Sequence, residues 1–189
     1  AGPTELLQAN LHVRRRGRRT LVIEAELLAD DERPAGSALL TFAVVPRPEH
    51  LVNITIDMTP GRRKMNANST HEKLEMSYLD ELELRVSQPG IASIELRPVV
   101  CNTVGALHGA IHASLVDEAS ASLARSFFDG RAVTTDMHLA YLDLGRVGPL
   151  VATATAIGGP SGGRLTTSVD VHDGNGALVS TATTKVVAL

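Results

Sequence analysis

The chain has 189 residues, of which 43% are hydrophobic and only 3% aromatic, so its core must be aliphatic. The net charge of -3 at pH 7 argues against general nucleic-acid binding, and a single cysteine excludes an internal disulfide. No apolar stretch reaches transmembrane length and no signal peptide is visible, so we expect a cytoplasmic protein with no membrane partner.

The N-terminal part of the chain predicts strands. From Leu21 to Leu27 every second residue is apolar and the acidic residues lie between them, which is typical of a half-buried strand. A second strand is expected from Ala38 to Val45, where Pro46 and Pro48 end it. Residues 49–65, which contain Pro60-Gly61, predict a linker.

Residues 66–189 predict a mixed α+β domain. A short helix is expected near 70–82 and a long one at 109–128. Strands are expected at 83–87, 91–97, 134–142, 150–157, 164–172 and 177–187.

Three short segments recur in the same order at the two ends of the chain, which predicts an internal repeat. They are Gly2-Pro3 with Gly148-Pro149, Gly17-Arg18 with Gly163-Arg164, and, after a gap, Thr41–Val45 with Thr184–Ala188. Residues 1–48 then correspond to the C-terminal strands of a unit whose complete copy spans 66–189.

Asp117 lies in the middle of the long predicted helix, where its neighbours are small. At 100° per residue its face also carries Ala110, Ala113, Ser114, Ala121 and Ala124. An ordinary exposed aspartate is one interpretation. However, a solvent face normally carries Lys, Glu and Gln, and this face has none. The alternative is that a site needs the charge there, because an isolated buried carboxylate is costly.

The start of the same helix predicts an anion site. Gly105 and Gly109 bracket residues 106–108, and a glycine N–H at a helix N-terminus lets a ligand come close while the helix dipole favours negative charge. An oxyanion donor together with a carboxylate such as Asp117 is what thioester hydrolysis requires.

Residues 102–109, Asn-Thr-Val-Gly-Ala-Leu-His-Gly, followed by Asp117, resemble the N-x-x-G-x-x-H-G-G…D signature of hotdog-fold acyl-CoA thioesterases, in particular the phenylacetyl-CoA thioesterase-like branch. Residues 133–141 resemble the strand that follows the hotdog helix. The resemblance covers about 66–189 and implies a long central helix wrapped by an antiparallel sheet.

The resemblance also implies roles for four residues. Asp117 falls on the catalytic acid and Gly109 on the oxyanion donor. Asn102 falls on a residue that holds the thioester or water, and Thr134 on a hydroxyl that orients water. The chain departs from the signature at Ala110, which replaces its second glycine.

Each of these positions has a simpler interpretation. Asn102 caps a turn in one reading, and Thr134 is a common strand residue. His108 is expected to pack and hydrogen-bond near the helix start, beside the substrate, rather than to act as a base. The basic cluster that contains Arg15, Arg16 and Arg18 is either a solvated turn or a clamp for the phosphates of coenzyme A.

Three other motifs receive a structural interpretation and predict no catalytic or metal site. Cys101 is interpreted as a structural thiol, and Gly159–Gly163 matches G-x-S-x-G but is expected to be a hairpin turn, because a strand follows it. His108 and His112 share a helical spacing without an evident third ligand, so no metal site is predicted.

We therefore expect an acyl-CoA thioesterase that uses no metal or redox cofactor, with coenzyme A entering as part of the substrate. The alternative is a non-catalytic acyl-CoA-binding hotdog protein, a ligand sensor. The resemblance implies that paired units place the Asn and Gly of one opposite the Asp of the other. Residues 1–48 have no counterpart of these residues, so a homo-oligomer, at least a dimer, is expected.

Overall fold

The computed structural model describes residues 7–29, 32–44, 77–102 and 104–189. The chain divides into two compact units, Ala1–Met65 and Asn66–Leu189. The predicted linker at 49–65 and most of the helix expected near 70–82 lie outside the described residues. The assignment of residues 1–48 to a partial repeat stays a prediction.

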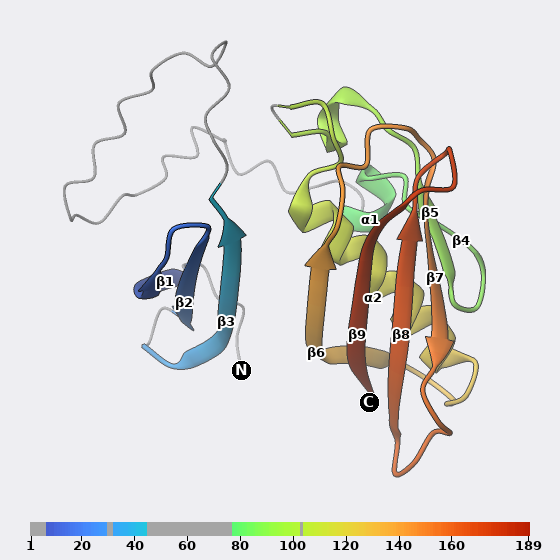
Figure 1. Ribbon diagram of the computed structural model, residues 1–189. Coiled ribbons are helices and arrows are strands. Elements are labelled where there is room, and N and C mark those ends of the chain that lie inside the picture. Colours follow the sequence, from blue (N-terminus) through green and yellow to red (C-terminus); the bar gives the residue numbers. More distant parts are fainter. Residues whose placement is uncertain (1–6, 30–31, 45–76, 103) are drawn as a thin grey trace. The chain divides into compact units, whose positions relative to one another are not determined.

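The first unit contains an antiparallel sheet of order β1-β2-β3 (Figure 1). Its strands are β1 (Gln8–Arg16), β2 (Thr20–Leu28) and β3 (Pro34–Ala43). The strand expected at Leu21–Leu27 is confirmed as part of β2, but its burial does not alternate, because Val22 and Glu24 are half-buried like Ile23. The third strand begins at Pro34, earlier than the expected Ala38.

The second unit is a long helix packed on a sheet of order β4-β5-β7-β8-β9-β6. Its helices are α1 (Tyr78–Glu81), the 3-10 turn η1 (Pro98–Val100) and α2 (Gly109–Arg125). Its strands are β4 (Arg85–Gln88), β5 (Ile91–Ile94), β6 (Ala132–Tyr141), β7 (Leu150–Ala156), β8 (Arg164–His172) and β9 (Leu178–Ala188). All the strand pairs are antiparallel.

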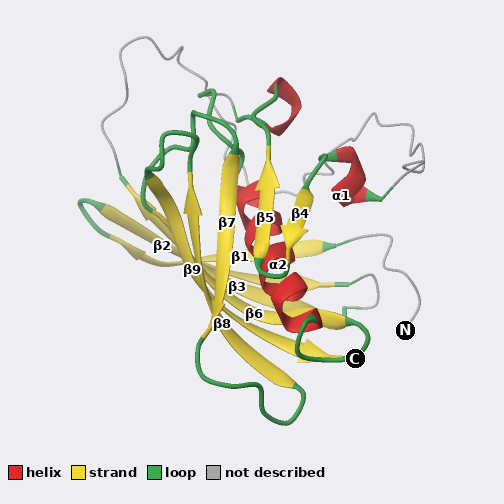
Figure 2. Cartoon of the chain, turned by 90° about the vertical axis from the view of Figure 1, so that its right-hand side faces the viewer, coloured by secondary structure: helices red, strands yellow, loops and turns green. Residues whose placement is uncertain are grey.

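The core of this unit lies between α2 and the sheet, as Figure 2 shows. Leu115, Val116 and Ala119 of α2 are fully covered, and they share one cluster with Ala152 of β7 and Val169 of β8. Small side chains on the sheet let the helix approach closely. The expected α+β fold, a central helix wrapped by an antiparallel sheet, is confirmed.

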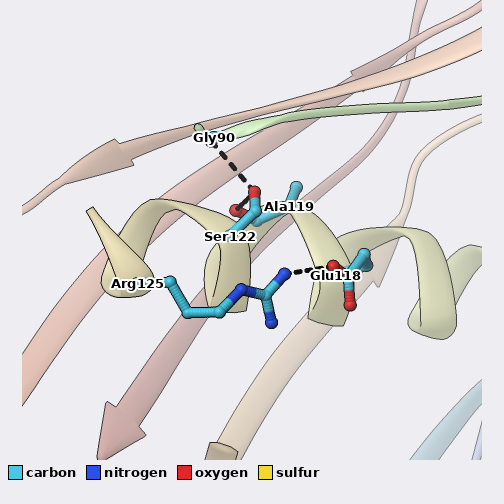
Figure 3. Close-up of polar contacts among 5 residues, drawn as sticks. All are labelled: Gly90, Glu118, Ala119, Ser122 and Arg125. Atoms are coloured by element: carbon cyan, nitrogen blue, oxygen red, sulfur yellow. Dashed lines mark hydrogen bonds and ion pairs between the residues drawn. The ribbon is translucent and has the colours of Figure 1, made fainter. Parts of the chain in front are cut away.

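Hydroxyl groups also cross this core. Ser120 Oγ donates to the Val116 carbonyl at 2.9 Å and lies 3.1 Å from Thr167 Oγ1, which in turn lies 2.8 Å from Thr184 Oγ1. On the next turn Ser122 Oγ accepts from the Gly90 N–H at 3.0 Å and donates to a carbonyl of its own helix (Figure 3). These buried hydroxyls are therefore satisfied, and their hydrogen bonds fix the helix against specific strands.

The two units have strand pairs in the same register. In the first unit the facing pairs are Leu21 with Phe42, Ile23 with Leu40 and Ala25 with Ala38. In the second they are Leu165 with Val186, Thr167 with Thr184 and Val169 with Ala182. Both pairings also shift at the corresponding point, after Leu27 and after Val171. One constant spacing relates all these positions, and it differs from the spacings of the sequence matches, so the repeat stays a prediction.

Candidate active site

At the N-terminus of α2, one backbone donor has no acceptor within the described part of the chain. His108 caps the helix, and its Nδ1 accepts from the Ala110 N–H at 3.2 Å. The His108 carbonyl accepts from the N–H groups of Ile111 at 2.9 Å and His112 at 3.0 Å. Among the described residues, nothing accepts from the Gly109 N–H, the first of the helix. The helix dipole favours negative charge at this donor.

Asn102 holds the loop that leads into α2. Its Oδ1 accepts from the Val104 N–H at 3.0 Å and the Ala106 N–H at 3.1 Å, and its own N–H donates to the Ala106 carbonyl at 2.8 Å. Two N–H donors converge on one side-chain atom, which must therefore be the oxygen. The Nδ2 group makes no hydrogen bond to the described part of the chain. Asn102 thus caps a turn, as one interpretation predicted, and still presents a fixed donor.

Two further contacts fix the position of this loop. The His108 N–H donates to the Val100 carbonyl at 2.9 Å, and the Leu107 N–H donates to the Gly145 carbonyl at 2.9 Å. Gly105, at the tip, has a φ of +74°, a left-handed conformation that favours glycine. The loop backbone therefore brings Asn102, His108 and Gly109 together at the start of the helix.

Asp117 lies further along α2 and is exposed. Within the described residues its carboxylate has neither a hydrogen bond nor an ion pair. Its neighbour Glu118 pairs with Arg125 instead, as Figure 3 shows. Ala121 and Ala124, which the sequence interpretation placed on the face of Asp117, are buried in the core. Asp117 is therefore exposed at the border of this face, while the sheet covers the small residues one to two turns further on.

One helix cannot bring Gly109 and Asp117 to the same substrate atom. They are eight residues apart, which corresponds to about 12 Å along the axis at the rise of an α-helix. An oxyanion donor and a base both need to lie about 3 Å from the groups that they serve. Within one chain, these two residues therefore cannot act on the same substrate atom.

Thr134 lies on β6 with its side chain toward α2. It is half-buried while Val133 and Thr135 are exposed, and Ala132, two residues earlier, packs against the core. Its Oγ1 atom is buried and has no hydrogen-bond partner among the described residues. The predicted strand is correct, and the hydroxyl is available for a further partner.

Sequence reasoning missed two polar residues beneath the helix start. His112 is 2% exposed, and its Nδ1 lies 3.2 Å from Ser180 Oγ. Burial lowers the pKa of His112 to about 4, so the ring is neutral at pH 7. Tyr141 Oη donates to the Gly109 carbonyl at 2.8 Å, and burial raises the pKa of its hydroxyl. The helical spacing of His112 from Leu115 and Ala119 was the signal that places it inward.

The predicted coenzyme A clamp lies in the first unit. Arg15 and Arg16 end β1 and Arg18 lies in the turn that follows; all three are exposed. Arg14 is 3.4 Å from Glu24 on the adjacent strand. The cluster therefore extends along a strand rather than forming only a turn, and its role toward a substrate stays a prediction.

The remaining motifs have structural roles. Gly159–Gly163 lies in the hairpin between β7 and β8, as predicted.

Over the described ranges, no group of three His, Cys, Asp or Glu residues is arranged to hold a metal ion. None of the helices described is both long enough and apolar enough to cross a membrane.

Comparisons with known proteins agree with this architecture. Residues 104–180 match the family model of the thioesterase superfamily. No curated protein matches the chain. A Bacillus halodurans protein crystallised with CoA is 24% identical, with a TM-score of 0.56 over 60% of this chain and 77% of its own.

Two other solved structures are similar. A thioesterase from Haemophilus influenzae is 18% identical, with a TM-score of 0.55 over 60% of this chain and 82% of its own. The PaaI protein of the phenylacetic acid degradation operon of E. coli is 20% identical, with a TM-score of 0.53 over 59% of this chain and 83% of its own. At these identities the structures establish the fold alone, and the family model covers residues 104–180, which is less than half of the chain. The second unit of the chain has the hotdog fold, and residues 104–180 within it are similar to the thioesterase superfamily.

Proposed function

We propose that this protein is an acyl-CoA thioesterase, which hydrolyses an acyl- or aryl-CoA thioester to a carboxylate and free CoA. The observation that carries the proposal is the free Gly109 N–H at the positive end of α2, in a first turn whose other amides are bonded. A donor held in this way stabilises an oxyanion without reorganising during the reaction. The similar fold of a protein crystallised with CoA supports the substrate class.

In the proposed reaction each of the predicted residues has a separate role. The thioester carbonyl oxygen accepts from the Gly109 N–H and becomes the oxyanion when the carbonyl carbon is attacked. Asn102 holds the carbonyl or the water through Nδ2, and Thr134 Oγ1 orients the water. His108 carries its proton on Nε2, because Nδ1 accepts from the backbone, and it contacts the substrate without acting as base.

Asp117 acts as the general base or as the nucleophile. Acting as a general base, it takes a proton from water as the new C–O bond forms. When the tetrahedral intermediate collapses, the C–S bond breaks and the proton passes to the thiolate of CoA. In the second version of the mechanism, Asp117 attacks the carbonyl itself, and the C–S bond breaks to release the thiolate of CoA. Water then hydrolyses the resulting anhydride to the carboxylate product and free Asp117, and a proton released in this step passes to the thiolate.

The distance between the two residues supports a site that is shared between two units. Because Gly109 and Asp117 of one helix are about 12 Å apart, the proposal places Asp117 of a second unit opposite Gly109. We therefore propose a homo-oligomer, at least a dimer. The strand β6 lies at the end of its sheet, and its Val133 and Tyr141 are exposed, so this edge and the exposed side of α2 are suited to such a contact.

Thiol release from a panel of aryl and medium-chain acyl-CoAs tests the proposal. We expect turnover with at least one class of acyl group. Tight binding of acyl-CoA without any thiol release would contradict the proposal and favour the non-catalytic ligand sensor instead.

A further inference from the structure

We infer that Tyr141 is a positioning residue for the oxyanion donor, because it holds the first peptide of α2 through the Gly109 carbonyl. This inference rests on the proposed function, since it assigns a role within the same site. Tyr141 is the last residue of β6, and its Oη lies 2.8 Å from the Gly109 carbonyl oxygen. The sheet thus contacts the helix at the residue that carries the free N–H.

The Gly109–Ala110 peptide is held at both ends. Its carbonyl accepts from Tyr141 Oη, and its N–H donates to His108 Nδ1 at 3.2 Å. Because a peptide group is planar, two such bonds fix its orientation. The adjacent peptide, between His108 and Gly109, carries the free N–H.

Gly109 itself needs this restraint. A glycine has more backbone freedom than any other residue, so a donor carried by glycine depends on its surroundings for a fixed direction. With the following peptide held by Tyr141 and His108, rotation about the Gly109 α-carbon is limited. The Gly109 N–H then points in one direction before the substrate arrives, which is what a preorganised donor requires.

Close contact explains why residue 109 is a glycine. A Cβ atom built on Gly109 would lie 3.3 Å from Tyr141 Oη and 3.6 Å from Cζ. The first contact is tighter than normal packing, whereas the second is ordinary. The glycine therefore provides room for the Tyr141 hydroxyl.

The tyrosine is itself held in place by groups from two other elements. The His112 ring of α2 lies edge-on to the Tyr141 ring, with centroids 5.6 Å apart and planes at 71°. His112 contacts Ser180 Oγ at 3.2 Å, and Ser180 on β9 is the cross-strand partner of Tyr141. The ring therefore has a defined position from which its hydroxyl reaches the Gly109 carbonyl.

The first experiment removes only the hydroxyl. Tyr141→Phe keeps the ring against His112, and we expect kcat for thioester hydrolysis to fall about tenfold with KM nearly unchanged, less than the loss of a whole oxyanion donor. The chain has two tyrosines, and Tyr78→Phe on the exposed α1 is the matched control, expected to retain full activity. Binding of a CoA thioether, which lacks the carbonyl, should be the same in all three proteins.

A pair of variants separates this role from general stability. Gly109→Ala places a methyl group against the Tyr141 hydroxyl, so it should lower kcat strongly. In the Gly109→Ala, Tyr141→Phe protein the hydroxyl is gone and the nearest remaining ring atom is at an ordinary distance. We therefore expect the double variant to be more active than Gly109→Ala alone. If the fold-loss of kcat in the double variant equals the product of the fold-losses in the two single variants, the inference is overturned.

Nuclear magnetic resonance distinguishes failure of this inference from failure of the proposed function. With ¹⁵N-glycine labelling, the order parameter of the Gly109 amide should be lower in Tyr141→Phe than in the native protein and in Tyr78→Phe. If the native protein releases no thiol, the proposed function fails, and the amide measurement alone decides the inference. An unchanged amide together with unchanged kcat would overturn it while leaving the function in place.

Discussion

The decisive residue is Asp117, a carboxylate with no partner in the described structure. Asp117→Asn keeps the shape of the side chain but removes its ability to act as base or nucleophile. We expect kcat to fall on the order of 10²–10⁴-fold while the protein stays folded. Glu118→Gln, which neutralises the adjacent carboxylate, is the matched control and should have a small effect on kcat. Near-normal turnover by Asp117→Asn, with native circular dichroism, would show that Asp117 is not the reactive group.

His112 predicts how stability changes with pH. Its pKa falls from 6.5 to about 4 in the folded protein, so the unfolded chain binds more protons between these values. The free energy of unfolding contributed by His112 is therefore complete above pH 6.5 and is lost as the pH falls toward 4. The expected loss is about 3 kcal/mol at 1.36 kcal/mol per pKa unit.

Urea unfolding at several pH values measures this contribution. His112→Gln retains a polar group near Ser180 but does not titrate. The native protein should therefore lose more stability than the variant between pH 6.5 and pH 4. Parallel curves for the two proteins would mean that His112 titrates normally in the folded state.

At the scale of elements, Asn102 fixes the loop before α2, and the proposed function gives it a chemical role as well. Asn102→Asp keeps an oxygen for the Val104 and Ala106 amides but removes the Nδ2 donor, whereas Asn102→Ala removes both. We expect Asn102→Asp to unfold at nearly the native temperature yet to lose about 10-fold or more in kcat. Asn102→Ala should lose activity and also about 1 kcal/mol of stability. Full activity of Asn102→Asp would limit Asn102 to capping the loop.

The sequence predicted most of the elements because their patterns are local. The alternation at Leu21–Leu27 and the helical spacing of Ile111, Leu115 and Ala119 gave the right structures at the right places. The helix start was predictable from the glycines and the motif. Contacts between the sheet and the helix were not predictable from the sequence. Nothing near residue 141 in the sequence indicates that its hydroxyl reaches Gly109, which is distant along the chain. The burial of Ala121 and Ala124 likewise depends on how far the sheet wraps around α2.

At the scale of the whole molecule, shared sites predict complementation. Asp117→Asn and a double variant at Asn102 and Gly109 should each be inactive. After subunit exchange, some sites combine the intact Asp117 of one chain with the intact Asn102 and Gly109 of another, so part of the activity should return. Mixtures that exchange subunits, shown by mass spectrometry, but stay inactive would mean that each site is built from one chain.

The arginine cluster of the first unit predicts an effect on substrate affinity alone. Changing Arg15, Arg16 and Arg18 to Ala should raise KM for acyl-CoA and weaken the salt dependence of KM, with kcat nearly unchanged. The matched variant with Lys at all three positions keeps the charge but not the bidentate contacts, so its KM should be intermediate. An unaltered KM would leave the cluster as a solvated strand end.

The order of the large sheet limits how far such an assembly can grow. If two copies join through β6 about a two-fold axis, the outermost strand on each side of the joined sheet is β4 (Arg85–Gln88), which has only four residues. Its pairing with β5 is interrupted by a shift between Val86 and Gln88, and Arg85 carries a charge at one end. Short, irregular and charged edges are poor templates for further strands. The pair of large sheets is therefore expected to close on itself instead of extending into a fibre.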